Sequence, residues 1–206
     1  MTSQPIRDPL ADHLLTAANS ALAVIDYQPS QIGAVRSIDH DLLLKNIVTT
    51  VKIAKVFGLP IIHSTINVAN GQGPTLPGLA EELAEYPPID RTQINSWEDV
   101  EFLAAVRAAG RRKLILCALW TEVCMAFPAL DAIRDGYEVY PVVDAIGGTS
   151  SEAHHAGIER TVQAGAKPIG WVSLACELQR DWARVETVPQ IVEIVITERL
   201  MQDSRP

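Results

Sequence analysis

Three polar residues in this sequence have side chains suited to nucleophilic catalysis, and each stands at the end of a short apolar run. Asp26 follows ALAVI, Lys113 precedes LILCA, and Cys124 comes soon after that second run, in TEVCM. A cysteine nucleophile needs a base to take its proton and a positive charge that favours the thiolate. Asp26 is the candidate base, which would later protonate the leaving group, and Lys113 is the candidate cation.

Each of the three residues also has an ordinary structural explanation. An aspartate that ends a strand often caps a helix or forms a turn. A lysine before a strand is usually solvated, and a cysteine on the apolar face of a helix is usually a small buried hydrophobe. Lys113 also stands at the opposite end of its strand, so its side chain would have to run along the sheet to reach the other two. Spacing alone leaves both explanations open.

Apolar segments of strand length alternate along the chain with segments of helical periodicity, and this alternation would position the three residues. Strands are expected at 21–25, 60–64, 113–118 and 137–143, with a short edge strand at 87–92 and a final strand at 168–172. Helices are expected at 41–57, 79–85, 99–109, 121–134 and 151–164, the last preceded by a capping box of Thr149 and Glu152. This alternation predicts an α/β fold, a three-layer α/β/α sandwich with a mostly parallel sheet. Asp26 and Cys124 are then expected at the carboxyl edge of that sheet, where ligands bind.

Length, charge and cysteine usage limit the class of protein. The chain has 206 residues, of which 48% are hydrophobic, so we expect one domain over 1–206, with an N-terminal extension at 1–18 and a C-terminal helix at 186–206. A net charge of -8 argues against nucleic acid or an anionic membrane as the main partner. Cys117, Cys124 and Cys176 do not resemble a disulfide framework. Without a signal-peptide pattern or a membrane-spanning run, we expect a reduced cytoplasmic protein.

Three motifs resemble those of the isochorismatase-like cysteine hydrolases. They are AVIDYQ around Asp26, RRKLIL around Lys113 and TEVCM around Cys124, and the likeness extends from Leu22 to Trp182. The later runs FPAL and ELQRDW resemble the YcaC-type branch of that family. Each motif alone is weak, but the three in this order are fairly specific. The family fold is a three-layer sandwich with Rossmann-like topology, in agreement with the alternation of strands and helices.

The resemblance implies a role for each motif residue. Cys124 would be the nucleophile, Asp26 the general base and then acid, and Lys113 the electrostatic partner. It also implies a cis peptide bond between Leu119 and Trp120, which would aim the backbone N–H of Trp120, with that of Cys124, at one oxyanion. The implied reaction is metal-independent hydrolysis of the C–N bond of a small amide, carbamate or related substrate through a thioester.

The sequence departs from the nicotinamidases of the family, which carry an Asp-x-His pair and a further histidine as a metal site. No Asp-x-His occurs in this chain. His63 is isolated in PIIHS, and His154 and His155 are adjacent, so on a helix they point in different directions. We therefore expect no metal and no cofactor, and the departure argues against nicotinamidase activity.

The substrate is expected to be a small molecule held in a small, partly apolar pocket. Its candidate lining residues are Gln28, Trp97, Trp120 and Phe127. Ordinary core packing explains each aromatic equally well, and Gln28 has backbone hydrogen bonding as an alternative role.

The sequence leaves two other functions open and also suggests an oligomeric state. Cys124 would also suit a redox-active thiol protein, and the fold would also suit a non-catalytic oligomeric binding protein. The resemblance to the YcaC-type branch implies a closed homo-oligomer, with an octamer as one form. The apolar segment 188–201 and the region of Trp171 and Trp182 are candidates for the interface, with packing inside one chain as the alternative.

Overall fold

A parallel sheet forms the centre of the molecule, whose residues 7–203 are described by a computed structural model. Its strands are β1 (Ser20–Ile25), β2 (Ile61–Ile66), β3 (Ile89–Arg91), β4 (Lys113–Ala118) and β5 (Glu138–Pro141). They lie in the order β3-β2-β1-β4-β5, and every neighbouring pair is parallel. All residues of the two central strands, β1 and β4, are buried, as expected for parallel strands covered on both faces.

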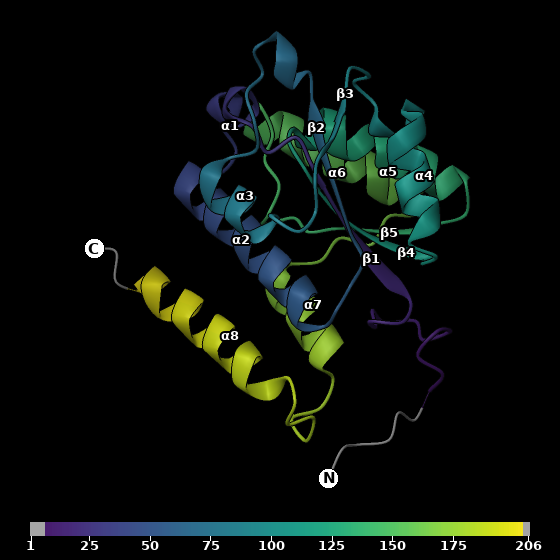
Figure 1. Ribbon diagram of the computed structural model, residues 1–206, viewed down its shortest axis with the longest axis vertical. Helices are drawn as coiled ribbons and strands as arrows, with labels where there is room; N and C mark the ends of the chain where they lie inside the picture. The colour runs from purple at the N-terminus through teal and green to yellow at the C-terminus, as the bar shows by residue number, and fades with distance from the viewer. Residues whose placement is uncertain (1–6, 204–206) are drawn as a thin grey trace.

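Helices cover both faces of the sheet and complete the predicted three-layer sandwich (Figure 1). They are α1 (Pro29–Ala34), α2 (His40–Val56), α3 (Pro77–Glu82), α4 (Val100–Ala108), α5 (Ala126–Arg134), α6 (Ser151–Ala164), α7 (Trp171–Gln179) and α8 (Val188–Asp203). In Figure 1, α2, α3 and α7 form one outer layer, and α4, α5 and α6 form the other. The helix α8 packs beside α2 and α7. Short helical turns η1 (Val68–Asn70), η2 (Ser96–Glu98) and η3 (Thr121–Met125) join the longer elements.

Local signals account for α2 and α4. The side chain of Asp39 accepts the N–H of Leu42 at the start of α2, and that of Asp99 accepts two N–H groups at the start of α4. The helix α2 buries an apolar stripe along the sheet and is followed by Gly58, whose φ of +64° lies in the left-handed region that favours glycine.

Two local predictions are wrong because a different side chain starts the helix concerned. The predicted final strand at 168–172 contributes only an isolated bridge through Ile169, and Trp171 begins α7. The carboxylate of Asp144, 27 residues away, accepts the N–H of Trp171 at 3.0 and 3.3 Å and starts that helix. The capping box before α6 is also absent, because Ser150 caps the helix instead.

The register of the central strands separates two of the predicted catalytic residues. Ser20 pairs with Lys113 and Ile25 pairs with Ala118, so Lys113 lies at the amino end of the sheet and Asp26 lies just beyond the carboxyl end. A strand of this length spans roughly 17 Å. The sheet therefore holds Lys113 away from Asp26, whereas Leu119 and Trp120 follow β4 at the same end as Asp26.

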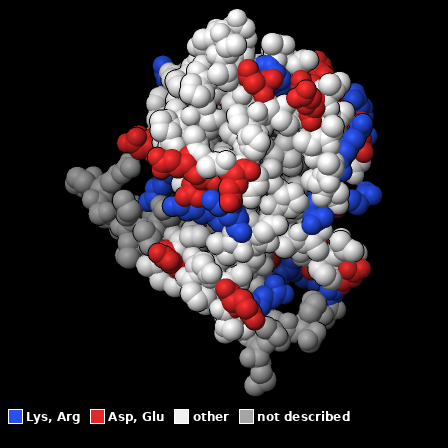
Figure 2. All heavy atoms as spheres, viewed as in Figure 1, with Lys and Arg blue, Asp and Glu red and all other residues white. Residues whose placement is uncertain are grey.

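Acidic and basic side chains lie interspersed on the face shown in Figure 2. The described part of that face therefore presents no continuous basic surface that would suit a phosphate backbone. No helix among the described residues is long and apolar enough to cross a membrane.

Candidate active site

Asp26 occupies an unusual backbone position at the end of β1. Its side chain is fully buried, and its φ is +63°, in the left-handed region that residues other than glycine seldom adopt. Its N–H donates to the carbonyl of Ser64 at 3.0 Å, and its own carbonyl accepts the N–H of Gln28 at 2.9 Å. Backbone outliers of this kind cluster at functional sites.

The positive charge beside Asp26 comes from Arg91, the last residue of β3. The Nη2 atom of Arg91 donates to Oδ2 of Asp26 at 2.5 Å, and both side chains are fully buried. Its Nη1 atom donates to the carbonyls of Gln93 and Ile94, in the loop that follows the strand. The guanidinium thus joins the carboxylate to this loop in the interior of the protein.

Lys113 does not belong to this site, and its predicted role as electrostatic partner is wrong. Its Nζ donates to the carbonyls of Asp12, His13 and Leu14 at 2.7, 2.7 and 3.0 Å, and it lies 5.5 Å from the ring centre of Tyr140. The physical reason is its position at the first residue of β4, a full strand length from Asp26. Its side chain ties the N-terminal segment to the amino end of the sheet.

Cys124 lies on η3, a π-helical turn between β4 and α5, and its side chain is 6% exposed. The turn follows a cis peptide bond between Leu119 and Trp120, which confirms that prediction. The carbonyl of Trp120 accepts the N–H groups of Val123 and Met125, each at 3.1 Å. The sequence predicted an α-helix from residue 121, whereas α5 begins at residue 126. π-Helical turns are rare in proteins, and many of those that do occur lie at functional sites.

The Cys124 thiol lies beside the Asp26 carboxyl group, and each alters the acidity of the other. Burial raises the pKa of Asp26 from 3.8 to about 6, against the opposing charge of Arg91. Burial, followed by the negative charge of Asp26, raises the pKa of the Cys124 thiol. Near neutral pH the pair therefore consists of a thiol and a carboxylate.

A backbone donor also lies near the Cys124 sulfur. The peptide N–H of Trp120 acts to lower the pKa of the thiol, although burial and Asp26 outweigh it. The indole of Trp120 is half-buried, and its Nε1 donates to the carbonyl of Gln31 at 2.7 Å. Phe127, also half-buried, lies 5.8 Å from the guanidinium of Arg160. Trp120 is the predicted pocket residue that the structure places directly beside Cys124.

Gln28 is not available to a substrate, because its amide binds backbone. It is fully buried; Nε2 donates to the carbonyls of Ile66 and Gly73 at 3.0 and 2.6 Å, and Oε1 accepts the N–H of Ile66 at 2.8 Å. These contacts hold the loop after β2 against the end of β1. The backbone alternative for Gln28 is therefore the correct one.

Trp97 is also part of the fold and not of a pocket. It is buried, donates from Nε1 to Asp135 at 2.9 Å, and packs edge-on against Tyr137 with ring centres 5.4 Å apart. The core-packing alternative holds for this aromatic, because its ring and its one polar atom both have partners.

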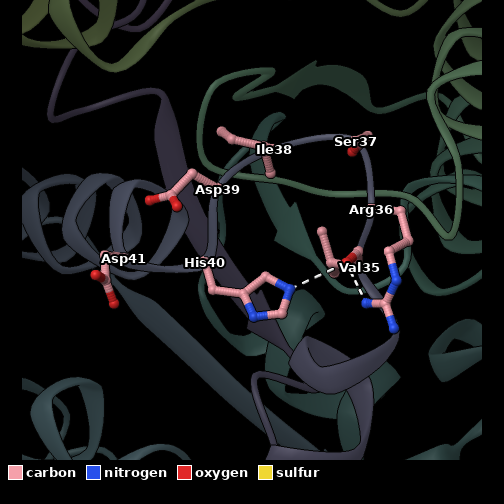
Figure 3. A pocket seen from close by; sticks show the side chains of 7 residues that line it. All are labelled: Val35, Arg36, Ser37, Ile38, Asp39, His40 and Asp41. Carbon is pink, nitrogen blue, oxygen red and sulfur yellow. Dashed lines mark hydrogen bonds between the residues drawn. The ribbon is translucent and has the colours of Figure 1, made fainter.

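A hollow of about 580 Å³ lies on the loop between α1 and α2, lined by Val35 to Asp41 (Figure 3). Its lining contains none of Asp26, Arg91 and Cys124. The Arg36 guanidinium and the His40 ring both bond to the carbonyl of Val35, as the dashed lines in Figure 3 show.

Hydrogen bonds within the fold hold the ring of His63. Both ring nitrogens of His63 have partners, the carbonyl of Tyr86 at 2.9 Å and the hydroxyl of Thr75 at 2.8 Å. Over the described residues, no three His, Cys, Asp or Glu side chains gather closely enough to hold a metal ion.

The chain belongs to the isochorismatase family: the family model described as "Isochorismatase domain" matches residues 20–173. The chain is 38% identical to the probable hydrolase YcaC of Escherichia coli (strain K12) over 165 residues, which cover 80% of this chain and 79% of that protein. The likeness to the YcaC-type branch is thereby confirmed.

Solved structures agree with this assignment. YcaC of Escherichia coli, described as an octameric hydrolase of unknown specificity, superposes with a TM-score of 0.85 at 33% identity and covers 98% of both chains. YcaC of Pseudomonas aeruginosa, described with hexane-2,5-diol and covalent acrylamide, also gives a TM-score of 0.85, at 32% identity, over 93% of this chain and 96% of that one. The nicotinamidase PncA of Bacillus subtilis, at 16% identity and a TM-score of 0.63 over 73% of this chain and 98% of that one, shares the fold alone.

Proposed function

We propose that the protein is a metal-independent cysteine hydrolase that cleaves the C–N bond of a small amide, carbamate or related substrate. The observation that carries the proposal is the Cys124 thiol beside the buried Asp26 carboxylate, which is itself paired with Arg91 at 2.5 Å. Membership of the isochorismatase family and likeness to a probable hydrolase support it. A redox role lacks comparable support, since Cys117 is fully buried in β4 and Cys176 lies exposed on α7.

In this mechanism the Cys124 sulfur attacks the substrate carbonyl carbon while Asp26 takes the thiol proton. The backbone N–H groups of Trp120 and Cys124 donate to the oxygen that becomes negatively charged. The protonated Asp26 then gives its proton to the leaving nitrogen, the C–N bond breaks, and an acyl or carbamoyl thioester remains. A water molecule, deprotonated by Asp26, attacks the thioester and releases the acid with the thiol restored. Arg91 keeps Asp26 ionised and in place throughout.

The relative from Pseudomonas aeruginosa suggests a chemical probe. Its structure is described with covalent acrylamide, a molecule that is both a small primary amide and an electrophile for thiols. We propose that acrylamide enters the site of this chain and alkylates Cys124. Cys124 lies beside Trp120 and keeps 6% of its surface exposed, which supports this proposal.

A screen of small amides, carbamates and ureas with rapid acid quenching tests the proposed reaction. We expect turnover of at least one compound and, in the quenched enzyme, a mass increase equal to its acyl or carbamoyl group on the peptide that contains Cys124. Peptide mass spectrometry gives the measurement, and the peptide that contains Cys176 is the internal control. Hydrolysis without an adduct at Cys124, or no hydrolysis of any compound, would contradict the proposal.

We also propose that the chain works in the cytoplasm as a closed homo-oligomer, an octamer by analogy with YcaC of Escherichia coli. The supporting surface lies at the C-terminal side, where Trp182, Val185 and Ile196 are 64%, 62% and 50% exposed. Trp171, a predicted interface residue, is buried within the chain and does not contribute. Sedimentation at micromolar concentration is expected to give about 180 kDa, eight chains of 22.4 kDa. A species of one chain mass would disprove it.

A further inference from the structure

A second polar cluster lies against the turn that carries Cys124, and the proposed mechanism does not use it. We call it the turn-holding cluster; its members are Thr121, Glu122, Thr149 and His154. The N–H and hydroxyl of Thr149 both donate to Oε1 of Glu122, at 3.0 and 2.5 Å. The hydroxyl of Thr121 and Nδ1 of His154 lie 2.8 Å apart. Thr121, the first residue of η3, is thus bound by His154 of α6. Glu122, the second, is bound by Thr149, which precedes the residue that caps α6.

Backbone packing holds the same turn from the same direction. A Cβ atom added at Gly157 of α6 would lie 2.9 Å from Cα of Glu122 and 3.0 Å from its nitrogen. Real Cβ atoms do not approach other atoms so closely, so this glycine is required for the contact between α6 and η3. The N–H of Thr121 also donates to the carbonyl of Gly147 at 2.9 Å. Side chains and backbone of residues 147–157 therefore fix the start of η3.

The start of η3 sets the geometry of the reacting groups. Trp120, the residue before the turn, supplies the N–H that faces the Cys124 sulfur, and its carbonyl accepts two N–H groups of the turn. Asp26 follows a different element, β1, so the sulfur and the base keep their alignment only if η3 keeps its place. Catalytic groups need such support from surrounding hydrogen bonds and packing.

We infer that the turn-holding cluster is a set of positioning residues, which keeps the Cys124 sulfur and the Trp120 N–H aligned with Asp26. The inference rests on the proposed cysteine chemistry, but its test does not require turnover. If the cluster only stabilised the fold, its loss would lower the melting temperature and leave the reactivity of Cys124 in the folded protein unchanged. If it positions the turn, the reactivity changes as well.

A matched pair of substitutions at Thr121 tests the inference. Thr121→Val keeps the shape and removes the hydroxyl, whereas Thr121→Ser restores the hydroxyl. The measurement is the rate of Cys124 alkylation by acrylamide across pH 6–9, followed by mass spectrometry at temperatures where the protein is folded. We expect Thr121→Val to react about five- to tenfold more slowly at each pH, because the thiolate loses a backbone donor. Thr121→Ser should recover most of the rate.

Thr161→Val is the control for general destabilisation. Thr161 is also buried on α6, but its hydroxyl donates to the carbonyl of Ile158 in its own helix at 2.8 Å. Its loss is expected to lower the melting temperature and leave the alkylation rate unchanged. Should Thr121→Val fail to fold, Thr149→Val replaces an exposed residue and is expected to slow alkylation about two- to fourfold.

Two results would overturn the inference. One is an alkylation rate of Cys124 in folded Thr121→Val or Thr149→Val equal to that of the wild type. The other is a Thr161→Val rate lowered as much as theirs. A failed substrate screen would contradict the proposed hydrolase function and leave these alkylation rates as an independent measurement. With a substrate in hand, the same variants should lower kcat with little change in KM, since the inferred role of the cluster is to hold η3 and not to bind substrate.

Discussion

Replacing Cys124 by alanine is expected to lower kcat/KM at least about 10³-fold while the fold survives, because no other group of the site replaces the attacking sulfur. The fold should survive because the change removes a single side-chain heavy atom, the sulfur, and introduces no new polar group. The measurement is initial rates on any substrate found in the screen, with circular dichroism and melting temperature recorded on the same samples.

Cys176→Ala is the matched control, since Cys176 is the exposed cysteine of α7 and lies outside the site. It should keep wild-type rates. A Cys124→Ala protein that turned over substrate normally would exclude covalent catalysis by this residue. Equal losses in both variants would point instead to a general effect of removing a thiol.

The strand ends explain why most of the fold and part of the site are predictable from the sequence. The predicted strand at 113–118 coincides with β4, because a strand buried on both faces is mostly apolar, as its run LILCA is. Asp26 and Cys124 meet because the carboxyl ends of parallel strands share one edge. The cis bond between Leu119 and Trp120 was expected from the family resemblance and not from periodicity.

The wrong prediction for Lys113 and the missed role of Arg91 both depend on contacts between segments far apart in the sequence. Lys113 lies in the right motif but at the wrong end of its strand, which the register against Ser20 makes plain. Arg91 was missed because it ends a three-residue edge strand interrupted upstream by prolines, so nothing local distinguished it from a solvated charge. The one feature of the sequence that could have indicated Arg91 is its place at the end of a predicted strand, which is also the position that made Asp26 a candidate.

Arg91 and Lys113 therefore give opposite expectations when each is replaced by methionine. Arg91→Met should lower kcat/KM about 10²- to 10³-fold and destabilise the fold by about 3–5 kcal/mol, because it leaves the Asp26 carboxylate buried without its partner. Lys113→Met should also destabilise the fold, since three carbonyls lose their donor, but the folded protein should keep wild-type kcat/KM. Rates normalised to the folded fraction from urea titrations separate the two effects.

The pH dependence shows how Arg91 acts. Asp26 must be ionised to take the thiol proton, and burial places its pKa at about 6, so wild-type kcat/KM should rise with pH through that value. Arg91 opposes this upward shift, so the rise in Arg91→Met should move to higher pH, whereas in Lys113→Met it should stay in place. An unmoved rise in Arg91→Met, or a shift in Lys113→Met, would contradict the assignment of Arg91 as the partner of Asp26.

Ionisation of Asp26, which the proposed reaction needs, lowers the free energy of unfolding. Because the folded pKa of Asp26 lies above its ordinary value of 3.8, the folded protein binds this proton more tightly than the unfolded chain. The contribution of Asp26 to stability is therefore fully present below about pH 4 and declines as pH rises through about 6, by roughly 3 kcal/mol. Catalysis needs the ionised form, the less stable of the two. The buried ion pair with Arg91 limits that loss. Arg91→Met should therefore show a steeper loss of unfolding free energy between pH 5 and 7.5 than the wild type. An equal slope would show that Arg91 does not stabilise the ionised base.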